Sequence, residues 1–176
     1  MSVDELQNAA QRLRQSFDRA FAAAVAGSTE VHEDFLMIRA AGDRYALRLS
    51  QIAGLIADRP LVPMPSPLPE FLGLVGIRGR ILPVYAFGQL LGSGSAPEAT
   101  RWLVHSAGEQ PVAFAFEQLE GLVRTPSREL QGSAAVDERG LESAMLESPA
   151  GRLPVVNVPS VVEAIGRRLR TASQGA

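Results

Sequence analysis

An internal duplication constrains this sequence more than any other feature. When the chain is shifted against itself by 67 positions, residues 35–56 lie over residues 102–123 without a gap. Six positions are identical in the two segments: Leu36, Ala40, Ala46, Gln51, Gly54 and Leu55 lie over Leu103, Ala107, Ala113, Gln118, Gly121 and Leu122. Further along, Arg80, Leu82, Pro83 and Val84 recur as Arg152, Leu153, Pro154 and Val155. Self-similarity of this kind indicates two copies of one structural unit.

Each copy begins with the pattern of a β-hairpin. In the first, residues 35–40 and 45–49 flank a polar turn at 41–44, and apolar residues alternate at Tyr45, Leu47 and Leu49. The second copy repeats this with Val112, Phe114 and Phe116. Further strands are expected at 52–57, 80–85, 119–124, 141–147 and 152–157, and short helices at 86–91 and 69–75. Because proline cannot donate to a ladder, Pro83 and Pro154 must lie at a strand start, an edge or a bulge.

The pattern predicts a mainly β fold of two small, partly closed barrels of about five strands each, packed side by side. We expect lobe one at about 33–95 and lobe two at about 96–168, with room for terminal segments to cross between them. An α/β fold would need longer helices between the strands. Apolar residues at three- and four-residue steps predict an amphipathic helix over 2–25, within an N-terminal extension of residues 1–30. Its apolar stripe packs either on its own barrel or in a partner's groove. A second helix is expected at 159–169, followed by a loose tail at 171–176.

Composition excludes several classes of protein. The chain has no cysteine, so it offers no thiolate nucleophile or zinc ribbon, and a reducing cytoplasm suits it best. A net charge of −2 argues against a nucleic-acid partner. No stretch approaches the ~18 apolar residues of a membrane span, and Asp4 and Glu5 do not fit a secretory signal, so we expect no membrane insertion.

Few residues suggest catalysis, and we expect no metal or cofactor. The only histidines, His32 and His105, lie in no recognisable motif, and His105 is interpreted as a surface or half-buried strand residue. The glycine-spaced segment 73–80 holds Arg78 on a turn, where it is either a simple solvated residue or a functional one. Arg80 has a counterpart in Arg152 whereas Arg78 has none, which makes Arg78 the better functional candidate. The proline-rich segment 60–69 is expected to be a rigid strap across a barrel, or else a ligand of an SH3-like domain.

These residues occur in the order and spacing of a known family. The series Phe35, Tyr45-Ala46-Leu47, Ile52, Ile56, Pro69, Phe71, Gly73, Arg78-Gly79, Leu82-Pro83-Val84 and Leu90-Leu91-Gly92 resembles the CheW-like domain, over about residues 33–168 of an expected domain at 31–170. The resemblance implies two SH3-like five-stranded β-barrels and no catalytic activity. It also implies a non-enzymatic adaptor that couples the regulatory domain of a CheA-type histidine kinase to the cytoplasmic tip of methyl-accepting chemoreceptors.

The resemblance also implies which residues meet each partner. The kinase-facing residues are Ile52, Gly54 and Ile56, and the receptor-facing residues are Gly73, Arg78, Thr100, Leu103 and Leu122. The chain departs from the family pattern where it has Gly54, Gly76 and Ala86, since relatives carry an acid, an asparagine and an aspartate there. One alternative is therefore a divergent member that binds a receptor or another regulator without the kinase. Another is an enzyme or ligand-binding barrel that uses the cleft between the lobes, which aliphatic side chains filling that cleft would exclude.

Overall fold

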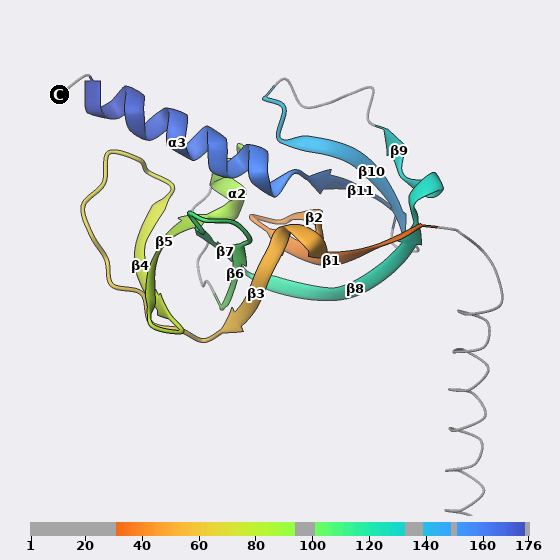
Figure 1. Cartoon of the computed structure of the whole chain (residues 1–176), viewed down its shortest axis with the longest axis horizontal. Helices are drawn as coiled ribbons and strands as arrows, with labels where there is room; N and C mark the ends of the chain where they lie inside the picture. Colours follow the sequence, from red (N-terminus) through yellow and green to blue (C-terminus); the bar gives the residue numbers. More distant parts are fainter. Residues whose placement is uncertain (1–30, 94–100, 133–138, 149–150, 175–176) are drawn as a thin grey trace, which may run out of the picture. The chain divides into compact units, whose positions relative to one another are not determined.

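The computed structural model describes residues 31–93, 101–132, 139–148 and 151–174, so the helix predicted over 2–25 lies outside the described residues. The strands are β1 His32–Ala40, β2 Asp43–Arg48, β3 Ile52–Ala57, β4 Phe71–Ile77, β5 Arg80–Ala86, β6 Trp102–Ser106, β7 Ala113–Phe116, β8 Gln118–Pro126, β9 Gln131–Gly132, β10 Glu142–Ser148 and β11 Gly151–Val156 (Figure 1). The helices are α2 Phe87–Leu90 and α3 Val158–Gln174, with short 3-10 turns at Leu49–Gln51 and Ser127–Glu129. The mainly β prediction is confirmed.

Two predicted helical segments turned out differently. The candidate at 69–75 was wrong, because Phe71–Ile77 forms β4, which pairs with β5 through a two-residue turn. The C-terminal helix extends beyond Leu169 to Gln174, so residues 171–174 are helical rather than loose. Here the Thr171 hydroxyl donates a hydrogen bond of 3.2 Å to the Arg167 carbonyl oxygen, one turn earlier.

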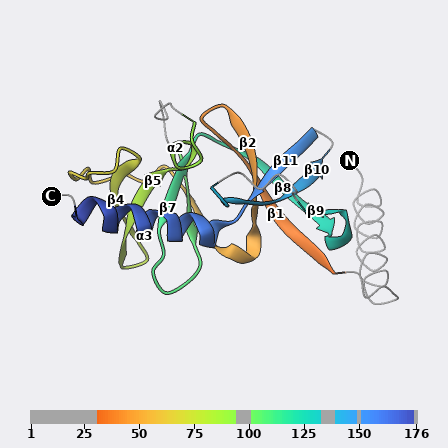
Figure 2. The same ribbon diagram turned by 90° about the horizontal axis from the view of Figure 1, so that it is seen from above.

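The strands form two sheets, and each sheet draws strands from both sequence copies. One sheet has the order β8-β1-β2-β11-β10-β9 and is called the first sheet here; the second sheet has the order β3-β6-β7-β5-β4. The hairpin of each copy therefore pairs with the remaining strands of the other copy, as β1 does with β8 (Figures 1 and 2) and β6 does with β3 (Figure 1). The expected boundary near residue 95 divides the two copies but not the two sheets. Crossing involves β3, β4, β5, β8, β9, β10 and β11 and is not limited to terminal segments.

The two prolines lie at corresponding places in the sheets. Pro83 in β5 directly precedes Val84, where β5 begins to pair with β7 in parallel. Pro154 in β11 directly precedes Val155, where β11 begins to pair with β2. A residue without an N–H group is tolerated at such a point because the ladder with the next strand starts after it.

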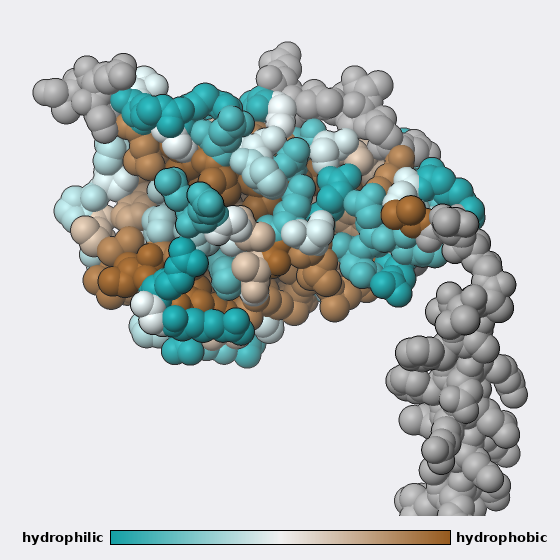
Figure 3. All heavy atoms as spheres, in the orientation of Figure 1, coloured by the Kyte–Doolittle hydropathy of each residue, from teal (hydrophilic) through white to brown (hydrophobic). Residues whose placement is uncertain are grey.

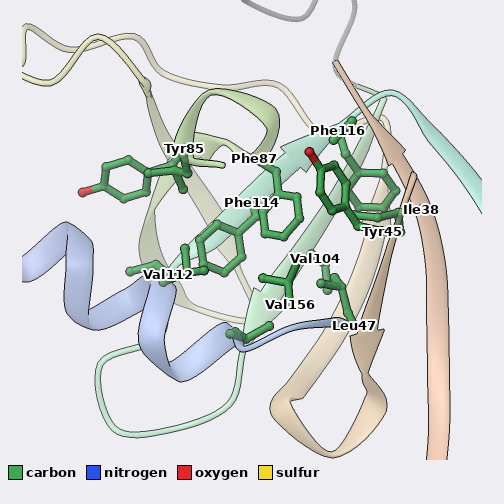
Figure 4. Packing of buried hydrophobic residues seen from close by; sticks show 14 of the residues in the cluster. Ile38, Tyr45, Leu47, Tyr85, Phe87, Val104, Val112, Phe114, Phe116 and Val156 are labelled. Carbon is green, nitrogen blue, oxygen red and sulfur yellow. The ribbon is translucent and has the colours of Figure 1, made fainter. Parts of the chain in front are cut away.

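Three groups of buried apolar side chains hold the fold together. One group lies within the first sheet and includes Phe35 and Leu146, and one lies within the second sheet and includes Val75 and Val84. The largest, called the central cluster here, joins both sheets and α3. Its labelled members in Figure 4 are Ile38, Tyr45, Leu47, Tyr85, Phe87, Val104, Val112, Phe114, Phe116 and Val156. Within the described residues, apolar side chains, aromatic as well as aliphatic, thus fill the space between the two sheets, which argues against the ligand site considered there.

Helix α3 begins at a conventional cap and packs on the central cluster. The Asn157 side-chain oxygen accepts a hydrogen bond from the Ser160 N–H group at 3.4 Å, and Gln51 accepts one from the Val158 N–H group at 3.0 Å. Val158, Val161 and Ile165 are buried on the inner face of the helix. None of the helices in the described part of the chain is long and apolar enough to cross a membrane.

An ion cluster ties the first copy to the second. The Glu120 carboxylate of β8 accepts hydrogen bonds from Arg44 Nε at 2.7 Å and from Arg39 Nη2 at 3.0 Å. These bonds, that from Arg44 above all, hold the pKa of Glu120 below its usual range although burial opposes the shift. Because β1 and β2 supply the arginines, the cluster reinforces the exchange of strands between the copies.

Candidate protein-interaction surface

The residues expected to face the kinase all lie on β3, a terminal strand in the order of the second sheet. Ile52 packs against the central cluster and Ile56 against the core of the second sheet, so both side chains are only partly accessible. Leu55 lies between them with 37% of its surface exposed. The aliphatic surface of β3 is therefore offered by Leu55, which sequence reasoning missed. The sequence did contain a signal for Leu55. Successive side chains of a strand point to opposite faces, so Leu55 points outward where Ile56 points inward.

The residues expected to face the receptor are distributed over both sheets. Leu103 is only 3% exposed and belongs to the core of the second sheet, so it supports β6 rather than presenting a side chain. Leu122 is 66% exposed on β8 of the first sheet. Thr100 lies outside the described residues. Gly73 is buried, and a Cβ atom there would lie 2.3 Å from the Val62 carbonyl oxygen, so this glycine lets the proline-rich strap cross β4 closely.

Arg78 occupies a strained position in the turn between β4 and β5. Ile77 pairs with Arg80, leaving Arg78 and Gly79 as a two-residue loop with φ of 48° and 77°. Positive φ at both residues is the pattern of a type I′ turn, where a non-glycine residue costs roughly 1–2 kcal/mol. The side chain of Arg78 is exposed. An arginine held at this cost is consistent with a functional use.

Gly54 makes room for His105 on the neighbouring strand. A Cβ atom at Gly54 would lie 2.5 Å from His105 Nε2, so any larger residue would displace the imidazole. His105 is partly buried, as expected from the sequence. Burial is the main cause that lowers the pKa of His105; a backbone hydrogen bond with Ser106 opposes this shift, and the positive charges of Arg78 and Arg80 lower the pKa by smaller amounts. A predicted kinase-facing residue and a predicted receptor-facing residue thus influence the same imidazole.

Three further apolar side chains are exposed on β5 and on the strap, and the sequence did not reveal them. Ile81 of β5 is 74% exposed, and Val62 and Met64 of the strap are 62% and 50% exposed. Val62 forms an isolated antiparallel bridge with Leu74 of β4. Figure 3 shows hydrophobic residues gathered at the lower left of the molecule, over β4 and β5. Apolar groups exposed together favour contacts with other proteins.

Gly54→Ala and Gly76→Ala provide a matched pair of tests. We expect Gly54→Ala to lower the free energy of unfolding by about 1–3 kcal/mol, because the new methyl group collides with His105. Gly76→Ala should change stability by less than about 1 kcal/mol, since a Cβ atom there meets nothing within 4 Å. Urea denaturation and the NMR signals of His105 measure the two effects. Equal stability of the two variants would contradict the close packing of His105 on Gly54.

Comparison with known proteins identifies the relatives of this fold. The crystal structure of the scaffolding protein TtCheW from Thermoanaerobacter tengcongensis matches with a TM-score of 0.66 and 11% sequence identity, over 73% of this chain and 90% of that one. At this identity the likeness concerns the fold alone. No curated protein sequence matches significantly. The family model of the CheW-like domain matches residues 34–165, which include nearly all of both sheets and the first half of α3. The chain therefore belongs to the CheW-like domain family.

Proposed function

We propose that this protein is a non-enzymatic adaptor that couples a CheA-type histidine kinase to the cytoplasmic tips of methyl-accepting chemoreceptors. The observation that carries the proposal is the match of the CheW-like domain over residues 34–165, a family of chemotaxis coupling scaffolds. The fold neighbour TtCheW is itself described as a scaffolding protein. A mainly apolar seam between the sheets and exposed aliphatic side chains at their edges suit a protein that works by contact.

The kinase contact is assigned to β3. Leu55 offers an exposed aliphatic side chain there, while Ile52 and Ile56 fix the strand by packing inward. As a terminal strand of the second sheet, β3 is open to packing against a partner barrel. Burying one leucine of this kind contributes about 1.5–3 kcal/mol when it is fully covered.

The receptor contact is assigned to the region of Arg78 in the second sheet and to Leu122 in the first. An exposed guanidinium can bind a carboxylate with two parallel hydrogen bonds, which gives geometric specificity. Leu122 adds an apolar contact, because 66% of its surface is exposed.

The second candidate function is binding of a receptor or another regulator without the kinase. It is favoured by Gly54, where relatives are expected to carry an acidic residue. In this chain the imidazole of His105 occupies the space above Gly54, so β3 offers no carboxylate at that point. Charge pairing with a kinase through this position is therefore lost.

Binding experiments with the cognate partners distinguish these functions. The purified protein is expected to bind both the kinase regulatory domain and the receptor tip, and to restore receptor control of phosphotransfer in a reconstituted mixture. Leu55→Asp should weaken kinase binding tenfold or more and leave receptor binding intact, whereas Arg78→Glu should weaken receptor binding to a similar degree. Arg59→Glu, at an exposed arginine outside the turn, is the charge-matched control.

Each outcome of these experiments selects one function. Normal receptor binding with no kinase binding and no control of phosphotransfer would support the second candidate. Unchanged binding of both partners by Arg78→Glu would overturn the receptor surface. Failure of the wild-type protein to bind either partner would overturn the adaptor function itself.

A further inference from the structure

A small pocket opens beside the turn that carries Arg78. It has a volume of about 200 Å³, and its lining combines apolar and basic residues from β3, β4, β5, β6 and the turn after β6. Ala53, Ile77, Leu82 and Pro111 contribute the apolar part of the wall. This volume is below the ~300 Å³ at which ligand pockets usually begin, so the pocket suits one side chain better than a cofactor.

The polar groups of the pocket carry positive charge or hydrogen-bond donors. Arg78, Arg80 and His105 all line it, and no acidic residue does. Among the residues that the structure describes, no carboxylate forms an ion pair with Arg78 or Arg80. Arg80 donates only a long hydrogen bond of 3.4 Å to the carbonyl oxygen of Glu109. The two guanidinium groups are thus available to an incoming anion.

His105 is a third polar residue that lines this pocket. Its Nδ1 atom is buried and forms no hydrogen bond of good geometry within the described part of the chain, and the backbone of Ser106 is the one neighbour that favours a protonated imidazole. A buried polar atom without a partner is costly and calls for an explanation. The neighbouring Ser106 hydroxyl accepts a hydrogen bond from the Val112 N–H group at 3.0 Å and, like any hydroxyl, can still donate its own proton.

We infer that this pocket receives the carboxylate of one acidic side chain from a partner protein, held by Arg78, Arg80 and His105. The apolar wall suits the methylene groups of a glutamate, and the two guanidinium groups suit its oxygens. As applied to a chemoreceptor, the inference rests on the proposed function, and it adds Arg80 and His105 to the residues that recognise this partner. A side chain at position 54 would collide with His105, so in the inferred complex the carboxylate comes from the partner and not from β3.

The chain is well suited to an NMR test because it contains only two histidines. Propionate, which has the shape of a glutamate side chain, is titrated into the full-length protein at constant ionic strength set with sodium chloride. We expect propionate to raise the pKa of the His105 imidazole, since a bound carboxylate favours its protonated form, and to leave His32 unchanged. Arg80→Gln and Arg78→Asn should each weaken the apparent affinity about tenfold. Asparagine is chosen at position 78 because it tolerates positive φ.

A charge-matched variant and a second anion serve as controls for specific binding of propionate in the pocket. Arg59→Gln removes a charge elsewhere on the surface and should bind propionate as the wild type does. No response of His105 to propionate would overturn the inference, and so would an equal response in the wild type and in Arg80→Gln. A response to inorganic phosphate but not to propionate would likewise overturn it in favour of a phosphate site.

Binding of the receptor tip to the wild type and to Arg80→Gln tests this inference separately from the proposed function. We expect Arg80→Gln to weaken receptor binding about tenfold, with the same raised pKa of His105 in the wild-type complex. If the tip binds the wild type and Arg80→Gln equally, the pocket inference fails and the adaptor function stands. If the receptor tip binds neither protein, but propionate binding still depends on the two arginines, the receptor assignment fails and the carboxylate pocket stands.

Discussion

Phe114→Ala is expected to lower the free energy of unfolding by about 3–5 kcal/mol. Phe114 is completely buried in the central cluster, where its ring packs edge to face on that of Phe87 with 5.3 Å between the ring centroids (Figure 4). The same cluster contains Ile38 and Leu47 of the first sheet, so truncation of Phe114 leaves a cavity at the junction of both lobes. A domain of this size has a total stability of about 5–15 kcal/mol, of which this change removes a large part.

Urea denaturation followed by tryptophan fluorescence measures the effect. The chain has a single tryptophan, Trp102, which packs against the central cluster and therefore reports on this junction. With a urea m-value of about 2 kcal/mol/M, the midpoint should fall by roughly 2 M. Leu122→Ala, at an exposed leucine of the first sheet, is the control and should change stability by less than about 0.5 kcal/mol. A shift of similar size in both variants would show that the central cluster does not join the lobes.

The sequence predicted the strands well because the alternation of apolar residues survives in both copies. Leu47 and Phe114, which the duplication places together, both lie in the central cluster, and Ala46 and Ala113 both lie inside their own sheets. A strand with one apolar face can bury only that face, so the alternation of apolar residues in the sequence matches the burial in the structure.

The gapless alignment of the copies is wrong by one residue in their first strands. Leu36 was placed over Leu103, yet Leu36 lies in the central cluster and Leu103 in the core of the second sheet. Leu36 pairs with Leu47 across its hairpin, whereas Val104, not Leu103, pairs with Phe114. Leu36 and Leu47 are 11 positions apart, whereas Val104 and Phe114 are only 10 positions apart, so the connection of the second hairpin is one residue shorter. A shift of one residue reverses the face of every side chain in a strand, which sequence identity alone does not register.

The exchange of strands between the copies was beyond what one sequence reveals. Strand β3 has the same pattern whether it pairs within its own copy or with β6 of the other copy, because both choices bury the same face. The surroundings of His105 in the candidate site could not be predicted for the same reason. The place of His105 above Gly54 depends on the pairing of β3 with β6, and this pairing joins residues 51 positions apart in the chain. Long-range pairing of this kind has no local signal.

Arg168→Gln is expected to lower the free energy of unfolding by about 3 kcal/mol. The side chain of Glu70 is only 6% exposed, and Arg168 Nη1 of α3 donates a hydrogen bond of 2.5 Å to its Oε1 atom. Removing the arginine leaves a buried carboxylate without a counter-charge, which typically costs about 3–5 kcal/mol. Because Arg168 itself is 42% exposed, water can partly replace it, and we expect the lower end of this range.

The neighbouring residue of the same helix provides the control. Arg167 pairs with Glu163 at 3.6 Å, and both side chains are mostly exposed, so Arg167→Gln should cost no more than about 0.5 kcal/mol. The double variant Arg168→Gln/Glu70→Gln should recover most of the lost stability, since a neutral amide replaces the stranded charge. Urea denaturation of the four proteins tests this. If Glu70→Gln failed to rescue Arg168→Gln, the loss would come from the packing of the arginine stem, and Glu70 would not be the residue that anchors α3 to the segment before β4.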